Sequence, residues 1–375
     1  MTSLPILLTT NSVSRPVRPM STFIIAEAGV NHNGSVERAL ELVDVAAKAG
    51  ADAVKFQTFQ AEEVMSDSAP KANYQKETTD EKESQLDMVR MLQLDRDAHR
   101  AIANRCIERS IQFLSTPFDT QSATFLVEIF NVPKLKIPSG EITNGPLLLH
   151  IARLERPVIL STGMSTLSEI EQALSVLAFG YTKNAANPSS LDLQQVFASD
   201  DGQKALAGNV TILHCVTEYP APMETVHLRA MDTIRHAFDL PVGLSDHTLG
   251  IAVPIAAVAR GACLIEKHFT LDQSLPGPDH QASLEPEELW DMVQGIRDVE
   301  TALGHPQKVP TGSEWDNRTI VRKSLVATES IGAGEVFTPD NLGAKRPGDG
   351  ISPMEYWAKI GNSSNKKYTK NSKIK

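Results

Sequence analysis

The sequence has little cysteine and no long apolar run, and both shortages restrict what the protein can be. Among 375 residues, no apolar stretch approaches the roughly 20 that a membrane-spanning helix needs, so we expect a soluble protein. The three cysteines, Cys106, Cys215 and Cys263, lack a short metal-ligand spacing, and two of them lie in apolar runs. We therefore expect buried free thiols and a cytoplasmic location, where thiols stay reduced.

Basic residues are also in deficit. The formal net charge is −10 at pH 7, which disfavours nucleic-acid binding because phosphate contacts require clustered lysine and arginine. Any anionic ligand must therefore meet a local positive site. The sequence also lacks the glycine-rich patterns of dinucleotide-binding and P-loop proteins, so no nucleotide cofactor is expected.

What the sequence does contain is a series of short apolar runs that each end in charged or hydrogen-bonding residues. Continuous apolar runs are typical of strands buried on both faces, and their alternation with helices indicates a parallel sheet. Eight such units can close into a (β/α)₈ (TIM) barrel, whose chemistry takes place at the carboxyl ends of the strands. The eight runs are 23–27, 53–57, 111–116, 134–141, 157–162, 210–215, 241–247 and 262–268.

Segments between these runs show helical periodicity. In the first, apolar residues recur at spacings of three and four, and Gly50 stands where a helix would end. Such a stripe packs on a sheet. The segments expected to be helical are 36–50, 97–109, 166–178, 225–238, 251–261 and 285–304.

The chain divides by composition into four parts. Residues 1–20 form an N-terminal extension without the basic start of a secretory signal, and 21–304 form the barrel. Residues 305–318 contain prolines and no periodicity, which is typical of a linker. Residues 319–375 contain short β-type runs between turns, so we expect a small β-rich domain.

Two polar insertions interrupt the barrel repeat. Residues 60–96 follow a strand, so we expect them over the mouth of the barrel. Residues 180–208 precede a strand, which places them nearer the bottom or the side.

Two histidines are the strongest candidates for chemistry. His247 and His268 end consecutive strands, so they should face each other at the barrel rim. Neutral imidazoles with nearby oxygens suit Mn²⁺, Fe²⁺, Co²⁺ or Zn²⁺. Glu266 points the same way as His268 because side chains alternate along a strand. The alternative is a pair of unrelated loop histidines.

Two lysines lie within strand runs. Lys55, with Gln57, alternates with apolar neighbours, and Lys136 interrupts an apolar run. A buried ammonium group is costly unless it is paired. Two lysines aimed at the mouth therefore suggest a phosphate or carboxylate ligand. Equally, each could pair with a barrel carboxylate such as Glu27, Glu141 or Glu266.

Serines and glutamates complete the set of strand-end candidates. Ser139 and Ser161 stand beside glycines and could present hydroxyl and N–H groups to an oxyanion, although short turns use the same residues for geometry alone. Glu27 and Glu141 could act in general acid–base catalysis if burial adjusts their pKa values.

Taken together, the ordered motifs resemble the sialic acid synthase family, the phosphoenolpyruvate-condensing synthases of N-acetylneuraminate, legionaminate and pseudaminate. The resemblance covers about residues 21–370. The motifs that carry it are FIIAEAGVNHNG, VKFQTF, LSTPFD, KIPSGE, LSTGM, SDHTLG, EKHFTLD, LPGPDH and KRPGDGIS.

The resemblance implies a TIM barrel followed by an antifreeze-like (SAF) domain, in a domain-swapped homodimer. It implies that phosphoenolpyruvate condenses with an open-chain N-acyl mannosamine-type sugar, and that phosphate leaves by C–O cleavage. His247 and His268 would bind Mn²⁺, with Mg²⁺ or Co²⁺ as alternatives, to activate the sugar aldehyde. The residues expected to hold phosphoenolpyruvate are Lys55, Lys136, Ser139, Ser161 and Ser245. Those expected to act on or contact the sugar are Glu27, Glu141, Tyr219, Asp279 and, across the dimer, Arg346.

The acceptor sugar stays open between N-acetylmannosamine and 2,4-diacetamido-6-deoxymannose. Thr217 stands two residues before the tyrosine of the YP motif, where N-acetylneuraminate synthases often carry an amide, and this favours a legionaminate-type enzyme. Two other functions are alternative hypotheses. One is a Schiff-base pyruvate aldolase that uses Lys55 or Lys136, and the other is a non-catalytic glycan-binding protein.

Overall fold

The computed structural model describes residues 21–66, 69–71, 84–183 and 187–375. The expected extension at residues 1–20 lies outside the described residues. The chain splits into two compact units, Met1–Gly304 and His305–Lys375. Among the described residues, no helix combines the length and the apolar character that crossing a bilayer requires.

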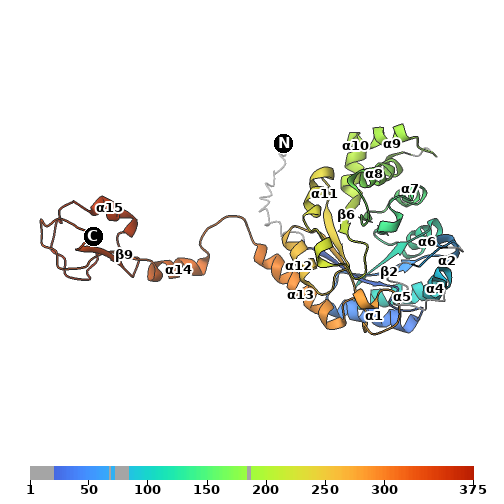
Figure 1. Cartoon of the computed structure of the whole chain (residues 1–375), viewed down its shortest axis with the longest axis horizontal. Helices are drawn as coiled ribbons and strands as arrows, with labels where there is room; N and C mark the ends of the chain where they lie inside the picture. The colour runs from blue at the N-terminus through green and yellow to red at the C-terminus, as the bar shows by residue number, and fades with distance from the viewer. Residues whose placement is uncertain (1–20, 67–68, 72–83, 184–186) are drawn as a thin grey trace, which may run out of the picture. The chain divides into compact units, whose positions relative to one another are not determined.

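The first unit is the expected barrel (Figure 1), and each of the eight predicted runs forms a strand. Seven parallel pairings give the order β3-β2-β1-β8-β7-β6-β5-β4, and β3 lies next to β4, so the sheet curves round on itself. The strands are β1 (Phe23–Gly29), β2 (Ala53–Thr58), β3 (Gln112–Pro117), β4 (Leu135–Ile137), β5 (Val158–Ser161), β6 (Val210–Cys215), β7 (Val242–Asp246) and β8 (Leu264–His268).

The six predicted helices are also present. Ser35 caps the first through its side chain, and Gly50 ends it with φ 83°, in the left-handed region that glycine adopts freely. The helices are α1 (Val36–Ala49), α5 (Arg96–Arg109), α8 (Leu167–Thr182), α11 (Ala230–Phe238), α12 (Ala252–Ala259) and α13 (Pro286–Leu303).

Two barrel helices were not predicted. They are α6 (Thr120–Phe130) and α7 (Gly145–Arg153), and each begins at a side-chain cap, Asp119 or Asn144, that accepts a backbone N–H. Both are short, and β-branched and aromatic residues in the first weaken its helical pattern. In the sequence, the capping residues Asp119 and Asn144 were the signals that could have located these two helices.

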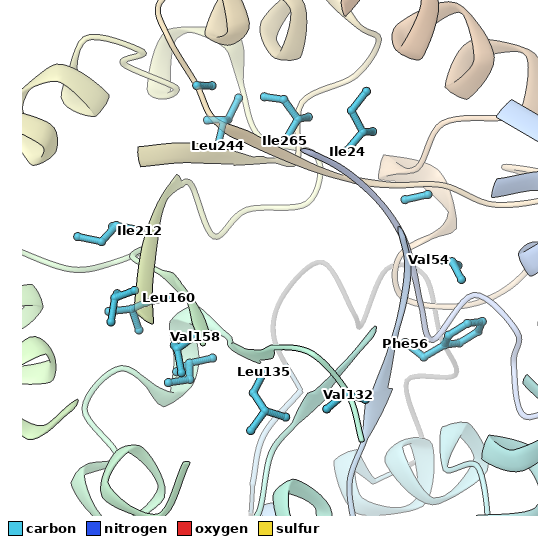
Figure 2. Packing of buried hydrophobic residues seen from close by; sticks show 14 of the residues in the cluster. Ile24, Val54, Phe56, Val132, Leu135, Val158, Leu160, Ile212, Leu244 and Ile265 are labelled. Carbon is cyan, nitrogen blue, oxygen red and sulfur yellow. The ribbon is translucent and has the colours of Figure 1, made fainter. Parts of the chain in front are cut away.

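Side chains alternate between two layers of core along each strand. Ile24 and Val54 pack outward against the helices, as do Leu160 and Ile212, and Figure 2 shows these residues around the ring of strands. Ile25 belongs instead to a separate buried cluster with Leu114, Ile159 and Leu213 from other strands. Burial on both faces explains why the strands have no polar alternation until they reach their carboxyl ends.

The two insertions contain helices that the sequence analysis did not predict. Residues 60–96 include α2 (Ala61–Val64) and α4 (Gln85–Leu92), and the latter buries Met88 and Val89. Residues 180–208 include α9 (Ser190–Phe197) and α10 (Asp200–Asn209), which lie beside α8 on the outside of the barrel (Figure 1). That is the side position expected of this insertion.

The second unit has its own small core. Strands β9 (Ser324–Ala327) and β10 (Leu342–Lys345) pair antiparallel, and a short helix, α15 (Tyr356–Lys359), follows. The buried residues of this core are Leu325, Ala327, Ile331, Phe337, Leu342, Tyr368 and Ile374. The segment expected to be a linker without periodicity instead runs into α14 (Gly312–Val321), because Thr311 and Glu314 form a capping box.

One expectation about the thiols was wrong. Cys106 and Cys215 are buried, as the apolar surroundings indicate, but Cys263 is exposed. It lies just before β8, at the amino end of the barrel, where the strand has not yet entered the core.

Gly243 offers a test of barrel packing. A Cβ atom there would clash with the backbone carbonyl of Leu264 and lie 2.8 Å from Leu213 Cδ2, so β7 and β8 would have to separate. We expect Gly243→Ala to lower the free energy of unfolding by about 1–3 kcal/mol, measured by urea denaturation.

Gly208→Ala is the matched control, because it lies in α10 with no atom within 4 Å of the added Cβ. It should instead stabilise the protein by about 0.5–1 kcal/mol. Equal stability of the two variants would contradict the packing described.

Candidate active site

A cavity of about 270 Å³ opens at the carboxyl ends of the barrel strands. The insertion after β2 contributes Val64, Met65 and Met88 to its lining, so the described part of residues 60–96 lies over the mouth as expected. Eleven of the predicted site residues line the cavity: Glu27, Lys55, Gln57, Lys136, Ser139, Ser161, Tyr219, Ser245, His247, His268 and Asp279.

Two predicted site residues are not among those that line the cavity. Glu141 does not line the cavity, and its carboxylate accepts a hydrogen bond from Asn144 Nδ2 at 2.7 Å. Arg346 belongs to the second unit, where its Nε donates to the carbonyl oxygen of Val321 at 2.7 Å.

A buried chain of alternating charges forms the floor of the cavity. Lys55 Nζ lies 2.6 Å from Glu27 Oε2 and 3.6 Å from Glu266 Oε2. Lys136 Nζ lies 2.9 Å from Glu266 Oε1. All four side chains are at most 5% exposed. Both lysines therefore pair with carboxylates, which answers the question of their partners that the sequence left open.

These ion pairs do not cancel the positive charge of the two lysines on the floor of the cavity. Burial raises the pKa of Glu27 to about 7, although Lys55 opposes this shift. Burial acts on Glu266 in the same direction, but Lys136 and Lys55 outweigh it and hold its pKa well below the usual range. Near neutral pH, two ammonium groups thus face one full carboxylate and one that is partly protonated. The excess positive charge suits an anionic ligand.

Hydroxyl groups surround the two lysines. Thr116 Oγ1 accepts from Lys55 Nζ at 2.9 Å, and Ser245 Oγ donates to Glu266 Oε1 at 2.9 Å. Ser161 Oγ is buried and has no hydrogen-bond partner among the described residues, so it is open to a ligand oxygen. Ser139 Oγ already accepts from the N–H of Gly163 at 2.9 Å.

The two histidines lie together at the rim. Their ring centroids are 5.5 Å apart, and Tyr219 stacks on His247 at 4.0 Å. Gly29, with φ 53°, leaves room for His268, because an added Cβ there would lie 3.3 Å from His268 Cε1. The two histidines are therefore not unrelated loop residues.

Both imidazoles suit a divalent cation. His247 Nδ1 lies 2.6 Å from the carbonyl oxygen of Val216, so Nδ1 is the protonated nitrogen and Nε2 is left as a ligand atom. His268 Nδ1 is buried without a hydrogen-bond partner among the described residues. Burial lowers the pKa of His268 well below its usual value, which keeps the ring neutral. No cluster of three or more histidine, cysteine or acidic side chains with metal-binding geometry occurs in the described ranges.

Asp279 approaches the histidines from the loop after β8. Its Oδ2 lies 3.9 Å from His268 Nδ1, and burial raises its pKa to about 6. Two hydrogen bonds hold this loop in place. Asn31 Nδ2 donates to Ser283 Oγ at 2.9 Å, and Ser283 Oγ donates to the carbonyl oxygen of Asp279 at 2.6 Å. Asn31, in the turn after β1, thus helps to fix Asp279, in the loop after β8.

Sequence reasoning missed two members of this site. Glu266 was noted only as a neighbour of His268 and a possible lysine partner, yet it bridges both lysines. Thr116 was passed over, although it ends a predicted strand at the catalytic face. The shared strand-end position was the signal that could have identified both.

Comparison with known proteins agrees with this geometry. The NeuB family matches residues 42–308, and the SAF domain matches residues 322–368. The N,N'-diacetyllegionaminic acid synthase of Campylobacter jejuni subsp. jejuni is 49% identical over 354 residues, covering 94% of this chain and 99% of that protein. The synthase of the same name from Legionella pneumophila is 45% identical, covering 90% of this chain and 88% of that protein.

A solved structure is also similar. The N-acetylneuraminic acid (sialic acid) synthetase of Leptospira borgpetersenii superposes with a TM-score of 0.65 at 34% identity, covering 79% of this chain and 90% of that one. The expected resemblance, the TIM barrel and the SAF domain are confirmed.

Removing the charge of Glu266 should destabilise the barrel strongly. In Glu266→Gln, two buried ammonium groups lose their shared counter-ion, so we expect the free energy of unfolding to fall by about 3–5 kcal/mol, measured by urea denaturation.

Glu62→Gln is the control, since it removes an exposed ion pair with Arg90 at 2.9 Å. That change should leave the free energy of unfolding close to the wild-type value, because solvent screens exposed ion pairs. A Glu266→Gln variant as stable as this control would show that the buried charges do not depend on one another.

Proposed function

The chain belongs to the NeuB family, and we propose that it condenses phosphoenolpyruvate with an open-chain N-acyl amino sugar to form a nonulosonic acid and phosphate. The observation that carries this proposal is the cavity that holds both lysines and both histidines. Its two ammonium groups are suited to a phosphorylated anion, and its two imidazoles to a metal ion beside a sugar. The enzyme is accordingly a transferase that forms a carbon–carbon bond.

Lys55 and Lys136 are proposed to hold phosphoenolpyruvate. Two ammonium groups offset the charge of its phosphate and carboxylate, and Ser161, Ser245 and Thr116 can donate or accept hydrogen bonds beside them. Glu27, with its pKa raised to about 7, can take or give a proton at the pH of the cell. We propose it as the group that moves a proton when water adds and phosphate leaves.

His247 and His268 are proposed to hold a divalent cation, with Mn²⁺ as the first candidate. Bound there, the cation would supply Lewis-acid polarisation of the sugar aldehyde. The chain itself supplies two oriented imidazoles, of which burial keeps that of His268 neutral, and a cavity partly covered by the insertion after β2. Tyr219 and Asp279, which lie against the two histidines, are proposed to orient the sugar.

The acceptor is proposed to be 2,4-diacetamido-6-deoxymannose, and the product a diacetyllegionaminate. Two relatives named for that product are 49% and 45% identical. Thr217, the residue that departs from the amide of N-acetylneuraminate synthases, lines the cavity beside Tyr219.

The Schiff-base aldolase fits the site less well. A lysine nucleophile needs a lowered pKa, whereas Glu266 and Glu27 outweigh burial and raise the pKa of Lys55. Lys136 is held in an ion pair at 2.9 Å from Glu266. Both lysines are therefore suited to binding an anion as cations.

A homodimer is proposed, in which Arg346 reaches the sugar bound by the partner subunit. We also propose a cytoplasmic location. The cysteines are free, which fits a reducing compartment.

An assay of phosphate release tests the reaction and the acceptor together. With phosphoenolpyruvate and Mn²⁺, we expect kcat/KM for 2,4-diacetamido-6-deoxymannose to exceed that for N-acetylmannosamine by about 100-fold or more, because an unmatched amide partner is costly. A chelator should abolish release. Borohydride trapping of an adduct with pyruvate, without phosphate release from phosphoenolpyruvate, would instead favour the aldolase. Phosphate release that resists the chelator would contradict the metal site.

Mixing two inactive variants tests the dimer. Lys136→Met and Arg346→Ala should each be inactive alone. If Arg346 acts across a twofold dimer, co-expression should restore about a quarter of wild-type activity, because half the dimers are mixed and each has one intact site. Mixed dimers that stay inactive would place Arg346 within its own subunit's site, and activity of Arg346→Ala alone would place it outside the reaction.

A further inference from the structure

Each of the two rim histidines follows a charged residue that faces away from the cavity. Asp246 precedes His247, and Lys267 precedes His268. Asp246 and Lys267 are direct partners in the parallel register of β7 and β8, and neither lines the cavity. Side chains alternate along a strand, so Asp246 and Lys267 point outward where His247 and His268 point into the cavity. The position of the outward pair therefore sets the position of the inward pair.

Asp246 and Lys267 form a buried ion pair behind the strands. Lys267 Nζ lies 2.6 Å from Asp246 Oδ2, and the two side chains are 0% and 2% exposed. Lys267 also donates to the carbonyl oxygen of Thr248. Thr248 returns two hydrogen bonds to Asp246, from its N–H at 3.1 Å and from its hydroxyl at 3.0 Å. Lys267 of β8 therefore contacts both chain neighbours of His247, Asp246 before it and Thr248 after it.

From this arrangement we infer that Asp246, Lys267 and Thr248 are positioning residues that set the separation and direction of His247 and His268 for a shared cation. The inference rests on the proposed function, since it assigns a role toward the metal of that site. The ion pair joins the backbone of the two strands at the residues directly before the two ligands. It thereby holds the imidazoles at the spacing that one cation can bridge.

General stability is a poor explanation for this pair. A buried ion pair often contributes no more than a well-packed apolar pair of the same volume. Hydrogen bonds from Ala221 N to His247 O and from Leu284 N to His268 O, both 2.9 Å, already secure each chain after its strand. The first ties His247 to the loop after β6, and the second ties His268 to the loop after β8. Asp246 and Lys267 instead tie β7 and β8 to one another.

The test is Mn²⁺ binding by the full-length protein, measured by electron paramagnetic resonance of the free ion. We expect Asp246→Asn/Lys267→Met, which removes both charges together, to remain folded and to raise the Kd for Mn²⁺ roughly ten-fold or more. The control is Asp52→Asn/Arg297→Met, which removes a 2.9 Å ion pair that joins α13 to the start of β2. It should leave the Kd for Mn²⁺ unchanged.

A second variant, Thr248→Val, tests the same inference if the double variant fails to fold. It removes only the hydroxyl group that donates a hydrogen bond to Asp246. It should weaken Mn²⁺ binding several-fold. Wild-type affinity in a folded double variant or in Thr248→Val would overturn the inference. If the wild-type protein itself bound no Mn²⁺, the proposed function would fail instead, so the two failures are distinguishable.

Discussion

The site depends on one buried interaction, the chain of charges from Glu27 through Lys55 and Glu266 to Lys136. Four ionisable groups in the middle of a barrel are tolerated because each ammonium lies within hydrogen-bond distance of a carboxyl group. The same pairing fixes the position of groups that come from four strands, β1, β2, β4 and β8. Without it, the barrel would have either an apolar floor or uncompensated charges.

This charge chain also explains how an acidic protein can bind an anion. The net charge of the chain is −10, so attraction has to arise locally. Burial raises the pKa of Glu27 to about 7, so the floor carries more positive than negative charge near neutral pH. The enol phosphate proposed as substrate would find that excess beside Lys55 and Lys136, in the same cavity as the two histidines.

The sequence was sufficient for the barrel because the strands are largely buried on both faces and therefore show as short, mainly apolar runs. It was less informative for α6 and α7, because these helices are too short to show a clear apolar periodicity. Only their capping residues, Asp119 and Asn144, mark where they begin. Most cavity residues were predictable because the carboxyl ends of parallel strands converge. The partner of Lys136 was not, since Glu266 is 130 residues away and two other carboxylates were equally plausible. Glu141 was placed among the site residues as a strand-end carboxylate and by resemblance, but it does not line the cavity and its carboxylate accepts a hydrogen bond from Asn144.

One cavity is proposed to hold a cation at His247 and His268 and a phosphorylated enol at Lys55 and Lys136. The decisive experiment is diffraction from crystals grown with Mn²⁺ and phosphoenolpyruvate, recorded at the manganese absorption edge. We expect an anomalous peak beside the two imidazoles and phosphate density beside the two ammonium groups. A manganese peak elsewhere on the protein, with the cavity holding only water, would refute this assignment.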